Sequence, residues 1–207
     1  MNKKLPTVYV ARHGDTAWTH SSQHTGFTDL PLTADGELHA RMLGKRLQEL
    51  NFVRVLTSPL QRAVRTCELA GFGATAEVDP DLVEWNYGEY ETMRDSEILA
   101  KYSDWQLFRD GCPGGESPTQ IGERADRLVQ RVRAVGGNVL LFSSGHFIRV
   151  LAAGWLGLAP GSLGMYLSVN PSSLSALSYE HTLGRPVIRL WNDDRHVCSV
   201  DTTKVEG

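Results

Sequence analysis

The residues of this sequence best suited to chemistry are Arg12, His13 and Gly14, which follow an apolar run at residues 8–11. An apolar run that ends at a turn signal is the pattern of a buried strand. Ligands bind at strand ends in open α/β sheets, and a glycine lets a ligand approach the backbone. The pattern predicts that His13 is a nucleophile for a phosphoryl group and that Arg12 binds the oxygens of that group.

A second cation is predicted at the start of a helix that begins at Ser58 and Pro59, because proline is favoured at the first helical position. Arg62 lies in the first turns of this helix. Free backbone N–H groups and a bidentate guanidinium both suit an anion there. We therefore expect Arg62 to serve the same site as His13, and Arg65, one turn later, to be solvated.

A candidate proton donor lies within residues 82–91, where acids alternate with aromatic residues. Glu84 stands next to Trp85 and near Tyr87. Partial desolvation by these rings would raise the pKa of a carboxyl group towards the range of a general acid. Taken without further context, the residues favour a solvated loop acid over this role.

Composition limits the classes of protein that this chain can form. Its 207 residues are 41% hydrophobic, which suits one α/β domain spanning 1–207 with a sizeable core. A formal net charge of -3 gives no nucleic-acid footprint and no basic face for a membrane. An anionic small-molecule partner remains compatible with this charge, and the sequence leaves the oligomeric state open.

Three cysteines, Cys67, Cys112 and Cys198, lie far apart and form no CxxC pair, so neither a disulfide framework nor a zinc site is expected. Residues 1–6 are not followed by the apolar segment of a signal peptide. No apolar stretch is long enough to span a bilayer. A cytoplasmic location is the resulting expectation.

Strands and helices alternate along the predicted chain, which implies a mostly parallel central sheet with helices on both faces, a three-layer α/β/α sandwich. A hairpin at 173–179 and 187–191 should add an antiparallel edge. The loop 12–32 is long enough to be functional, and we expect His20, His24 or Phe27 to touch a ligand. The predicted strands are 7–11, 52–57, 77–80 and 138–142, and the predicted helices are 33–50, the one from 58, 93–110, the one from 117 and the one ending at 156.

A helix over 93–110 is expected to bury one apolar face, formed by Ile98, Leu99, Tyr102, Trp105 and Phe108. Thr33, followed by acidic residues, looks like a capping box, and Ser117 is expected to cap the next long helix.

Four segments in this order together resemble the histidine phosphatase superfamily, also called phosphoglycerate-mutase-like, over nearly the whole chain. They are Arg12-His13-Gly14, the helix start 58–63, Glu84 before Tyr87-Gly88, and the strand, glycine and histidine around 146. Within the superfamily, residues 25–32, 84–91 and 109–112 look most like the sugar-bisphosphatase branch typified by sedoheptulose-1,7-bisphosphatase.

The resemblance implies a two-step phosphatase that uses no metal and no cofactor. His13 would form a phosphohistidine, Arg12 and Arg62 would clamp the phosphoryl oxygens, and Glu84 would give a proton to the leaving oxygen. The implied substrates are small phosphomonoesters such as sugar phosphates. Further phosphate-binding candidates are Ser144 and Gly145, and substrate-binding candidates are Thr19, Gln23, Thr25, Gly26, Tyr87 and His146.

One position departs from the family pattern, because Ser144 stands where the second active-site histidine is expected, directly before Gly145. A serine can donate a hydrogen bond but supplies no positive charge. Three explanations are open: a deliberately weakened variant, a natural member of reduced or altered activity, or an enzyme in which His146 replaces the missing group. The presence of every other motif member favours the first. A phosphoglycerate mutase and a non-catalytic phosphate binder are the alternatives to a phosphatase.

Overall fold

The computed structural model describes residues 5–19, 21 and 23–198. In this part of the chain one central sheet has six strands in the order β3-β2-β4-β1-β5-β6. The first four of these run parallel, whereas β5 lies antiparallel to both β1 and β6. The predicted parallel sheet with an antiparallel edge is therefore confirmed. The strands are β1 Val8–Arg12, β2 Arg54–Thr57, β3 Ala76–Val78, β4 Val139–Ser143, β5 Leu174–Tyr179 and β6 Pro186–Asp193.

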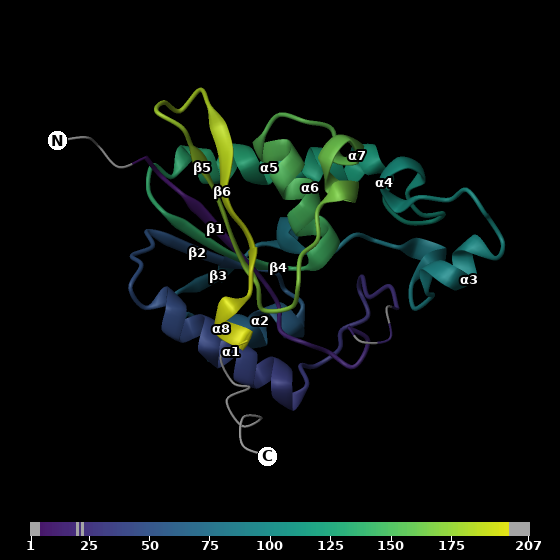
Figure 1. Ribbon diagram of the computed structural model, residues 1–207, viewed down its shortest axis with the longest axis horizontal. Coiled ribbons are helices and arrows are strands. Elements are labelled where there is room, and N and C mark those ends of the chain that lie inside the picture. The colour runs from purple at the N-terminus through teal and green to yellow at the C-terminus, as the bar shows by residue number, and fades with distance from the viewer. Residues whose placement is uncertain (1–4, 20, 22, 199–207) are drawn as a thin grey trace, which may run out of the picture.

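Helices cover both faces of this sheet and complete the three layers (Figure 1). On one face lie α1 (Ala34–Leu47), α2 (Gln61–Leu69) and α8 (Arg195–Cys198). The other face carries α5 (Pro118–Ala134), α6 (Gly145–Trp155) and α7 (Pro160–Leu163). Each face has its own hydrophobic core, because the strands bury side chains in both directions.

The chain also forms short helices, and those labelled at the right of Figure 1 lie beyond the sheet. The short helices are α3 Asp95–Leu99, α4 Leu107–Asp110 and the 3-10 turns η1 Pro80–Leu82, η2 Gly88–Tyr90 and η3 Gly164–Tyr166. In the described residues, no single helix is long and apolar enough to cross a membrane; α6 and Pro160–Tyr166 pass that test only as a pair bent by 103°.

The pairing of β1 with β4 decides where the candidate residues meet. The strands are parallel, with Val8 opposite Val139 and Arg12 opposite Ser143. Both strands therefore end at the same level of the sheet, so that His13 and Ser144 leave it side by side. β4 is buried along its whole length, which makes it a central strand as expected.

Two predicted helix starts are confirmed by their caps. The Thr33 hydroxyl accepts a hydrogen bond from the Gly36 N–H, and Ser117 forms a full capping box with Gln120. The capping box expected at Thr33 is incomplete, so that prediction is wrong in part. Gly36 lies three residues after the N-cap and has no side chain that could accept a hydrogen bond from the Thr33 N–H.

The continuous helix predicted over 93–110 is wrong, since α3 ends at Leu99 and α4 begins at Leu107. Side chains satisfy the backbone between them: Asp110 accepts the Gln106 N–H, and the Arg109 guanidinium donates to the Asp104 carbonyl. Two residues of the expected apolar face are consequently exposed, Leu99 by 40% and Tyr102 by 56%.

Smaller differences in boundary have local causes. β3 ends at Val78, because Pro80 begins a 3-10 turn. α2 begins at Gln61 rather than at Ser58, with Leu60 as its N-cap.

Cys67 and Cys112 are free and buried, and burial raises the pKa of each thiol to about 12. The side chain of Cys198, His20 and residues 1–4 lie outside the described residues.

Candidate active site

A cavity of about 260 Å³ opens where β1 and β4 end. Most of the candidate residues surround it, although they come from segments far apart in the sequence. Arg62, Ser144 and Gly26 are not part of its wall. The candidates that do line it are Arg12, His13, Thr19, Gln23, Thr25, Glu84, Tyr87, Gly145 and His146.

His13 is held in one tautomer by its own backbone neighbour. Its Nδ1 lies 2.8 Å from the carbonyl oxygen of Gly14, which can only accept, so Nδ1 carries the proton of the neutral ring. Burial, followed by the charges of Arg62 and Arg12, holds the pKa of His13 well below its usual value. The ring is therefore neutral near pH 7, and Nε2 keeps the lone pair that a nucleophile needs.

Arg12 offers an unused donor beside this histidine. Its Nη1 donates to the carbonyl of Val169 at 2.5 Å, but its buried Nε has no hydrogen-bond partner among the described residues. A Cβ on Gly145 would lie 3.3 Å from the Arg12 Nε and Cζ, so the glycine lets the guanidinium lie against the start of α6. A half-buried cation with a buried, spare N–H is suited to an anionic oxygen.

Arg62 is fully buried as the second residue of α2, and it binds backbone rather than the cavity. Its Nη1 donates to the Thr28 carbonyl, and its Nη2 donates to those of Thr25 and Gly26, at 2.8–3.0 Å. Its buried Nε has no partner among the described residues. Arg62 thus fixes the loop beside the cavity, and its charge adds to burial in lowering the pKa of His13.

The loop on which Gly26 lies is fixed from the opposite side as well. The Gly26 N–H donates to the Glu91 carboxylate at 2.9 Å, and the Thr28 N–H donates to the same oxygen. Both backbone groups of Gly26 are therefore engaged within the protein. Arg65, as expected, is a solvent-facing residue that pairs with Glu37.

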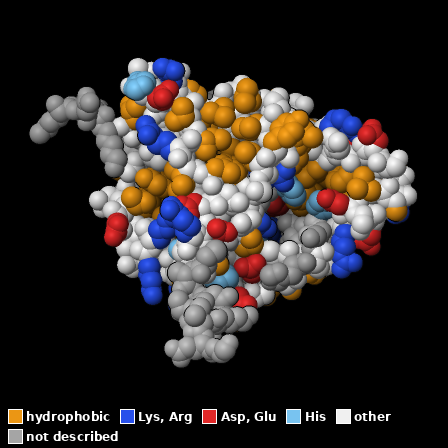
Figure 2. All heavy atoms as spheres, viewed as in Figure 1, with side chains coloured by type: hydrophobic (Ala, Val, Ile, Leu, Met, Phe, Trp, Pro, Cys, Tyr) orange, Lys and Arg blue, Asp and Glu red, His pale blue; other side chains and the backbone are white. Residues whose placement is uncertain are grey.

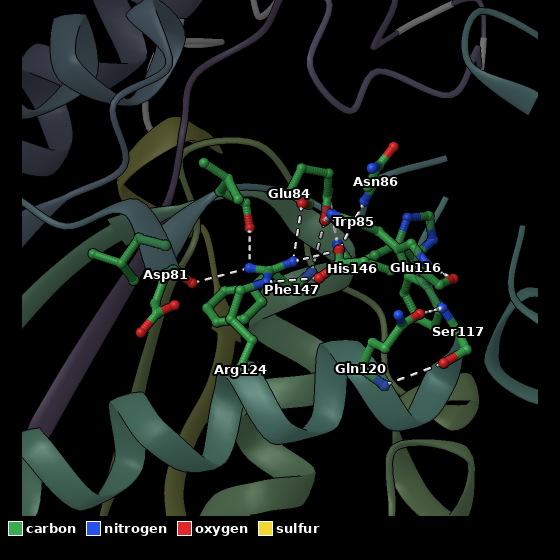
Figure 3. Close-up of polar contacts among 12 residues, drawn as sticks. Asp81, Glu84, Trp85, Asn86, Glu116, Ser117, Gln120, Arg124, His146 and Phe147 are labelled. Carbon is green, nitrogen blue, oxygen red and sulfur yellow. Dashed lines mark hydrogen bonds and ion pairs between the residues drawn. The ribbon is translucent and has the colours of Figure 1, made fainter. Parts of the chain in front are cut away.

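Glu84 is buried, with 5% exposure, so the interpretation as a solvated loop acid is wrong. Its carboxylate accepts the backbone N–H groups of Trp85, His146 and Phe147 at 2.8–3.0 Å (Figure 3). Two of these donors belong to the first turn of α6, the positive end of the helix dipole. Glu84 is thereby held at the cavity wall at the same helix start that carries Gly145.

Arg124 on α5, which does not line the cavity, holds the loop of Glu84 in place. Sequence reasoning missed this residue. All five guanidinium N–H donors of this buried arginine find oxygens: two on Glu116 and one each on the carbonyls of Asp81, Val83 and Glu84, at 2.7–3.1 Å (Figure 3). A signal was present, because an arginine at 124 falls on the apolar face of α5.

Ser144 occupies the N-cap position of α6 but makes no capping bond with its side chain. Its hydroxyl is fully buried and has no partner among the described residues. His146 lines the cavity, and its Nδ1 lies 2.5 Å from the Tyr87 hydroxyl. Burial and the charge of Arg149 hold the pKa of His146 well below its usual value, so this ring is neutral and does not supply the charge absent at Ser144.

Arg149 is a second cation in the cavity wall that sequence reasoning missed. It follows Gly145 by four residues on α6, and this spacing at a helix start was the available signal. Its Nε donates to the Gly164 carbonyl at 2.6 Å, and its guanidinium lies 4.4 Å from the centre of the Phe108 ring.

His24 also lines the cavity, whereas Phe27 does not and is 51% exposed. The Nε2 of His24 lies 2.9 Å from a carboxylate oxygen of Asp95, which joins the loop after β1 to α3. Its ring lies against that of Tyr87, with 4.5 Å between the centroids and an angle of 38° between the ring planes. Of the two loop candidates that the structure describes, His24 lies at the cavity and Phe27 does not.

Short internal hydrogen bonds fix the remaining polar residues of the wall. The Thr19 hydroxyl accepts the Thr16 N–H at 3.0 Å, the Gln23 amide donates to the Thr92 carbonyl at 3.1 Å, and the Thr25 hydroxyl donates to the Gln23 carbonyl at 3.0 Å. The described residues contain no group of three or more His, Cys, Asp or Glu arranged to hold a metal ion.

Known proteins resemble this chain over most of its length. An acid phosphatase from Mycobacterium tuberculosis is 36% identical over 178 residues, 84% of this chain and 87% of its own length. The sedoheptulose 1,7-bisphosphatase of Saccharomyces cerevisiae is 36% identical over 190 residues, 76% of this chain and 70% of its own length. The solved structure of an open reading frame product from Mycobacterium tuberculosis has a TM-score of 0.85 at 32% identity, covering 92% of this chain and 98% of that one.

Equal identity to an acid phosphatase and to a sugar bisphosphatase does not single out the sugar-bisphosphatase branch expected from the sequence. The superfamily itself is shown, because the model described as "Histidine phosphatase superfamily (branch 1)" matches residues 8–194. This chain belongs to branch 1 of the histidine phosphatase superfamily.

Proposed function

We propose that this protein is a phosphatase that hydrolyses small phosphomonoesters, among them sugar phosphates, through a phosphohistidine on His13. The observation that carries the proposal is the pairing at one cavity of a neutral His13, whose Nε2 carries no proton, with an Arg12 Nε that has no partner among the described residues. A nucleophile beside a half-buried cation with a spare donor suits a phosphoryl group, whose transfer depends on positioning and charge stabilisation.

In the first step, His13 Nε2 attacks phosphorus and the bond from phosphorus to the alcohol oxygen breaks. The Glu84 carboxyl group supplies a proton to that oxygen. In the second step, water attacks the phosphohistidine, Glu84 takes the proton of the water, and the bond between nitrogen and phosphorus breaks. Free phosphate leaves, and both side chains return to their starting states.

The polar wall supports a hydroxylated substrate. Side chains of Thr16, Gln23 and Asp95 face the cavity together with the cation of Arg149. These groups are suited to the hydroxyls of a phosphorylated sugar and to a further negative charge on it. The names of the two relatives at 36% identity, an acid phosphatase and a sugar bisphosphatase, support hydrolysis of a phosphate ester.

Trapping of the covalent intermediate tests this function. The chain is mixed with ³²P-labelled sugar phosphate, quenched in alkali and assayed for acid-labile label on the protein. We expect the unmodified chain to carry label and to release free phosphate, and we expect His13→Ala to carry none. Binding of the ester without label would instead indicate a non-catalytic binder. Conversion to an isomeric phosphate ester without phosphate release would indicate a mutase.

His146→Ala tests whether His146 stands in for the histidine that the family places at Ser144. Because His146 is neutral and held at 2.5 Å from the Tyr87 hydroxyl, we expect the phosphohistidine to form in the variant within about tenfold of the original rate. A loss of two orders of magnitude or more would assign that role to His146.

A further inference from the structure

A second cavity, of about 230 Å³, adjoins the first. The two share four lining residues, His24, Asp95, His146 and Arg149, so each of these side chains presents a surface to both. The first cavity holds the nucleophile, and the second has no part in the chemistry described above. The two cavities are therefore immediate neighbours, bounded by the same four side chains.

The wall of the second cavity is apolar where that of the first is polar. Its remaining lining residues, apart from Gln106, are Leu99, Trp105, Leu107, Phe108 and Met165.

Phe108 is the fixed centre of this apolar wall. The Arg149 guanidinium lies over its ring at 4.4 Å, and the His146 ring lies 5.7 Å away. A Cβ on Gly164 would come within 2.5 Å of the Phe108 ring, so η3 packs directly against it. Trp105 is held too, because its indole N–H donates to the Gly111 carbonyl at 2.9 Å. Such a preformed aromatic wall is typical of a small-molecule site.

Two aliphatic side chains at the cavity remain accessible to solvent, Leu99 by 40% and Met165 by 39%. They come from α3 and η3, on separate segments. Figure 2 shows hydrophobic side chains gathered on both sides of a hollow in which histidine side chains are visible. Apolar surface of this kind, next to a polar cavity, is suited to a ligand that has one polar and one apolar end.

We propose that the substrate spans both cavities: its phosphoryl group and adjoining hydroxyls lie in the first, and an aromatic or apolar group of the same alcohol lies in the second against Leu99, Phe108 and Met165. The inference rests on the proposed phosphatase function and names the class of ester within it. Arg149 and His146 stand at the junction and separate the polar part of the alcohol from its apolar end.

Two matched pairs of compounds test the proposal. Butylphosphonate and 4-phenylbutylphosphonate, which cannot be hydrolysed, measure binding by calorimetry. Butyl phosphate and 4-phenylbutyl phosphate measure hydrolysis with leaving alcohols of nearly equal acidity. We expect the phenyl-bearing member of each pair to be favoured by about tenfold or more in Kd and in kcat/KM, because its ring leaves water for the second cavity.

The double variant L99N/M165Q should reduce this preference to about threefold or less, since polar side chains would face the ring. Both positions are partly exposed, so the fold tolerates the exchange, and a melting curve checks it. L183N is the matched control, because Leu183 is 61% exposed on the hairpin turn and lines neither cavity. It should keep the full preference.

Equal affinity for the two phosphonates would overturn the inference, and so would a preference that L99N/M165Q leaves intact. If both esters are hydrolysed at equal kcat/KM, the phosphatase function stands and the second subsite fails. If neither ester is hydrolysed while the phosphonates differ tenfold, the subsite stands and the phosphatase function fails.

Discussion

Replacing Arg124 should impair the reaction from a position that does not line the cavity. The guanidinium holds the carbonyls of Asp81, Val83 and Glu84, and pairs with Glu116 at 2.7 Å. R124K keeps the charge but offers three donors instead of five and no planar fork. The Glu84 carbonyl is then no longer held in place, and the carboxyl group on the same residue can move relative to the start of α6.

The expected magnitudes follow from these contacts. R124M removes one partner of a buried ion pair and should lower the free energy of unfolding by about 3–5 kcal/mol. R124K should lower it by about 1.5–3 kcal/mol, the range for hydrogen bonds to charged groups. R127M is the matched control: Arg127 lies on the same helix, is 57% exposed and pairs with Asp81, so its loss should cost about 0.2–1 kcal/mol.

Two esters whose leaving groups differ in their need for a proton distinguish a positioning role of Arg124 from a merely structural one. A displacement of about 1 Å at Glu84 can cost about 100-fold in rate. R124K should therefore lower kcat/KM for an alkyl phosphate by about 100-fold, because the departing alkoxide needs a proton. For p-nitrophenyl phosphate, whose leaving group is stable as an anion, the loss should stay below about tenfold.

Kinetics with both esters, well below the melting temperature of R124K, checks this reasoning. R127M should leave both rates within about twofold. Equal losses for the two esters in a folded R124K protein would refute the link between Arg124 and proton transfer. Unchanged rates for both would show that the Glu84 loop keeps its position without the guanidinium.

Three further changes have defined outcomes. The rate of His13 phosphorylation should fall on the acid side only below about pH 6.5, because the pKa of His13 is lowered in the folded protein. As the pH drops below about 6.5, His13 of the unfolded chain takes up a proton before His13 of the folded chain does. The free energy of unfolding should therefore fall as the pH drops below about 6.5. A rate that already falls at or above about pH 6.5 in single-turnover kinetics would contradict the lowered pKa. S144H should raise turnover by about tenfold or more, and an equal or lower turnover would remove the idea that Ser144 weakens the site. G14A should cost about 1–3 kcal/mol in a denaturant titration, because the new Cβ would lie 2.5 Å from the Gly36 oxygen. G184A should be nearly neutral, because its Cβ would meet only the Thr182 hydroxyl, at an ordinary 3.8 Å.

Sequence patterns predicted the framework that positions the site. The apolar runs at 8–11 and 138–142 became the paired central strands β1 and β4, and the cap at Ser117 began α5 where expected. These features depend on neighbouring residues, so the sequence contains the information locally. The segment 93–110 was misjudged, since its helical spacing of apolar residues did not reveal that side chains would bind the backbone at 104–110 and interrupt the helix.

The sequence alone determined that His13 follows a strand end with Arg12 before it and Gly14 after it. Only the tertiary structure decided what surrounds them. Glu84 meets the start of α6 from about 60 residues away, and Arg124 fixes its loop from α5. Arg62 holds backbone carbonyls, and burial together with its charge lowers the pKa of His13. The physical reason is that these contacts join side chains to the backbone of distant segments, and packing of the layers brings such groups together independently of their spacing along the chain.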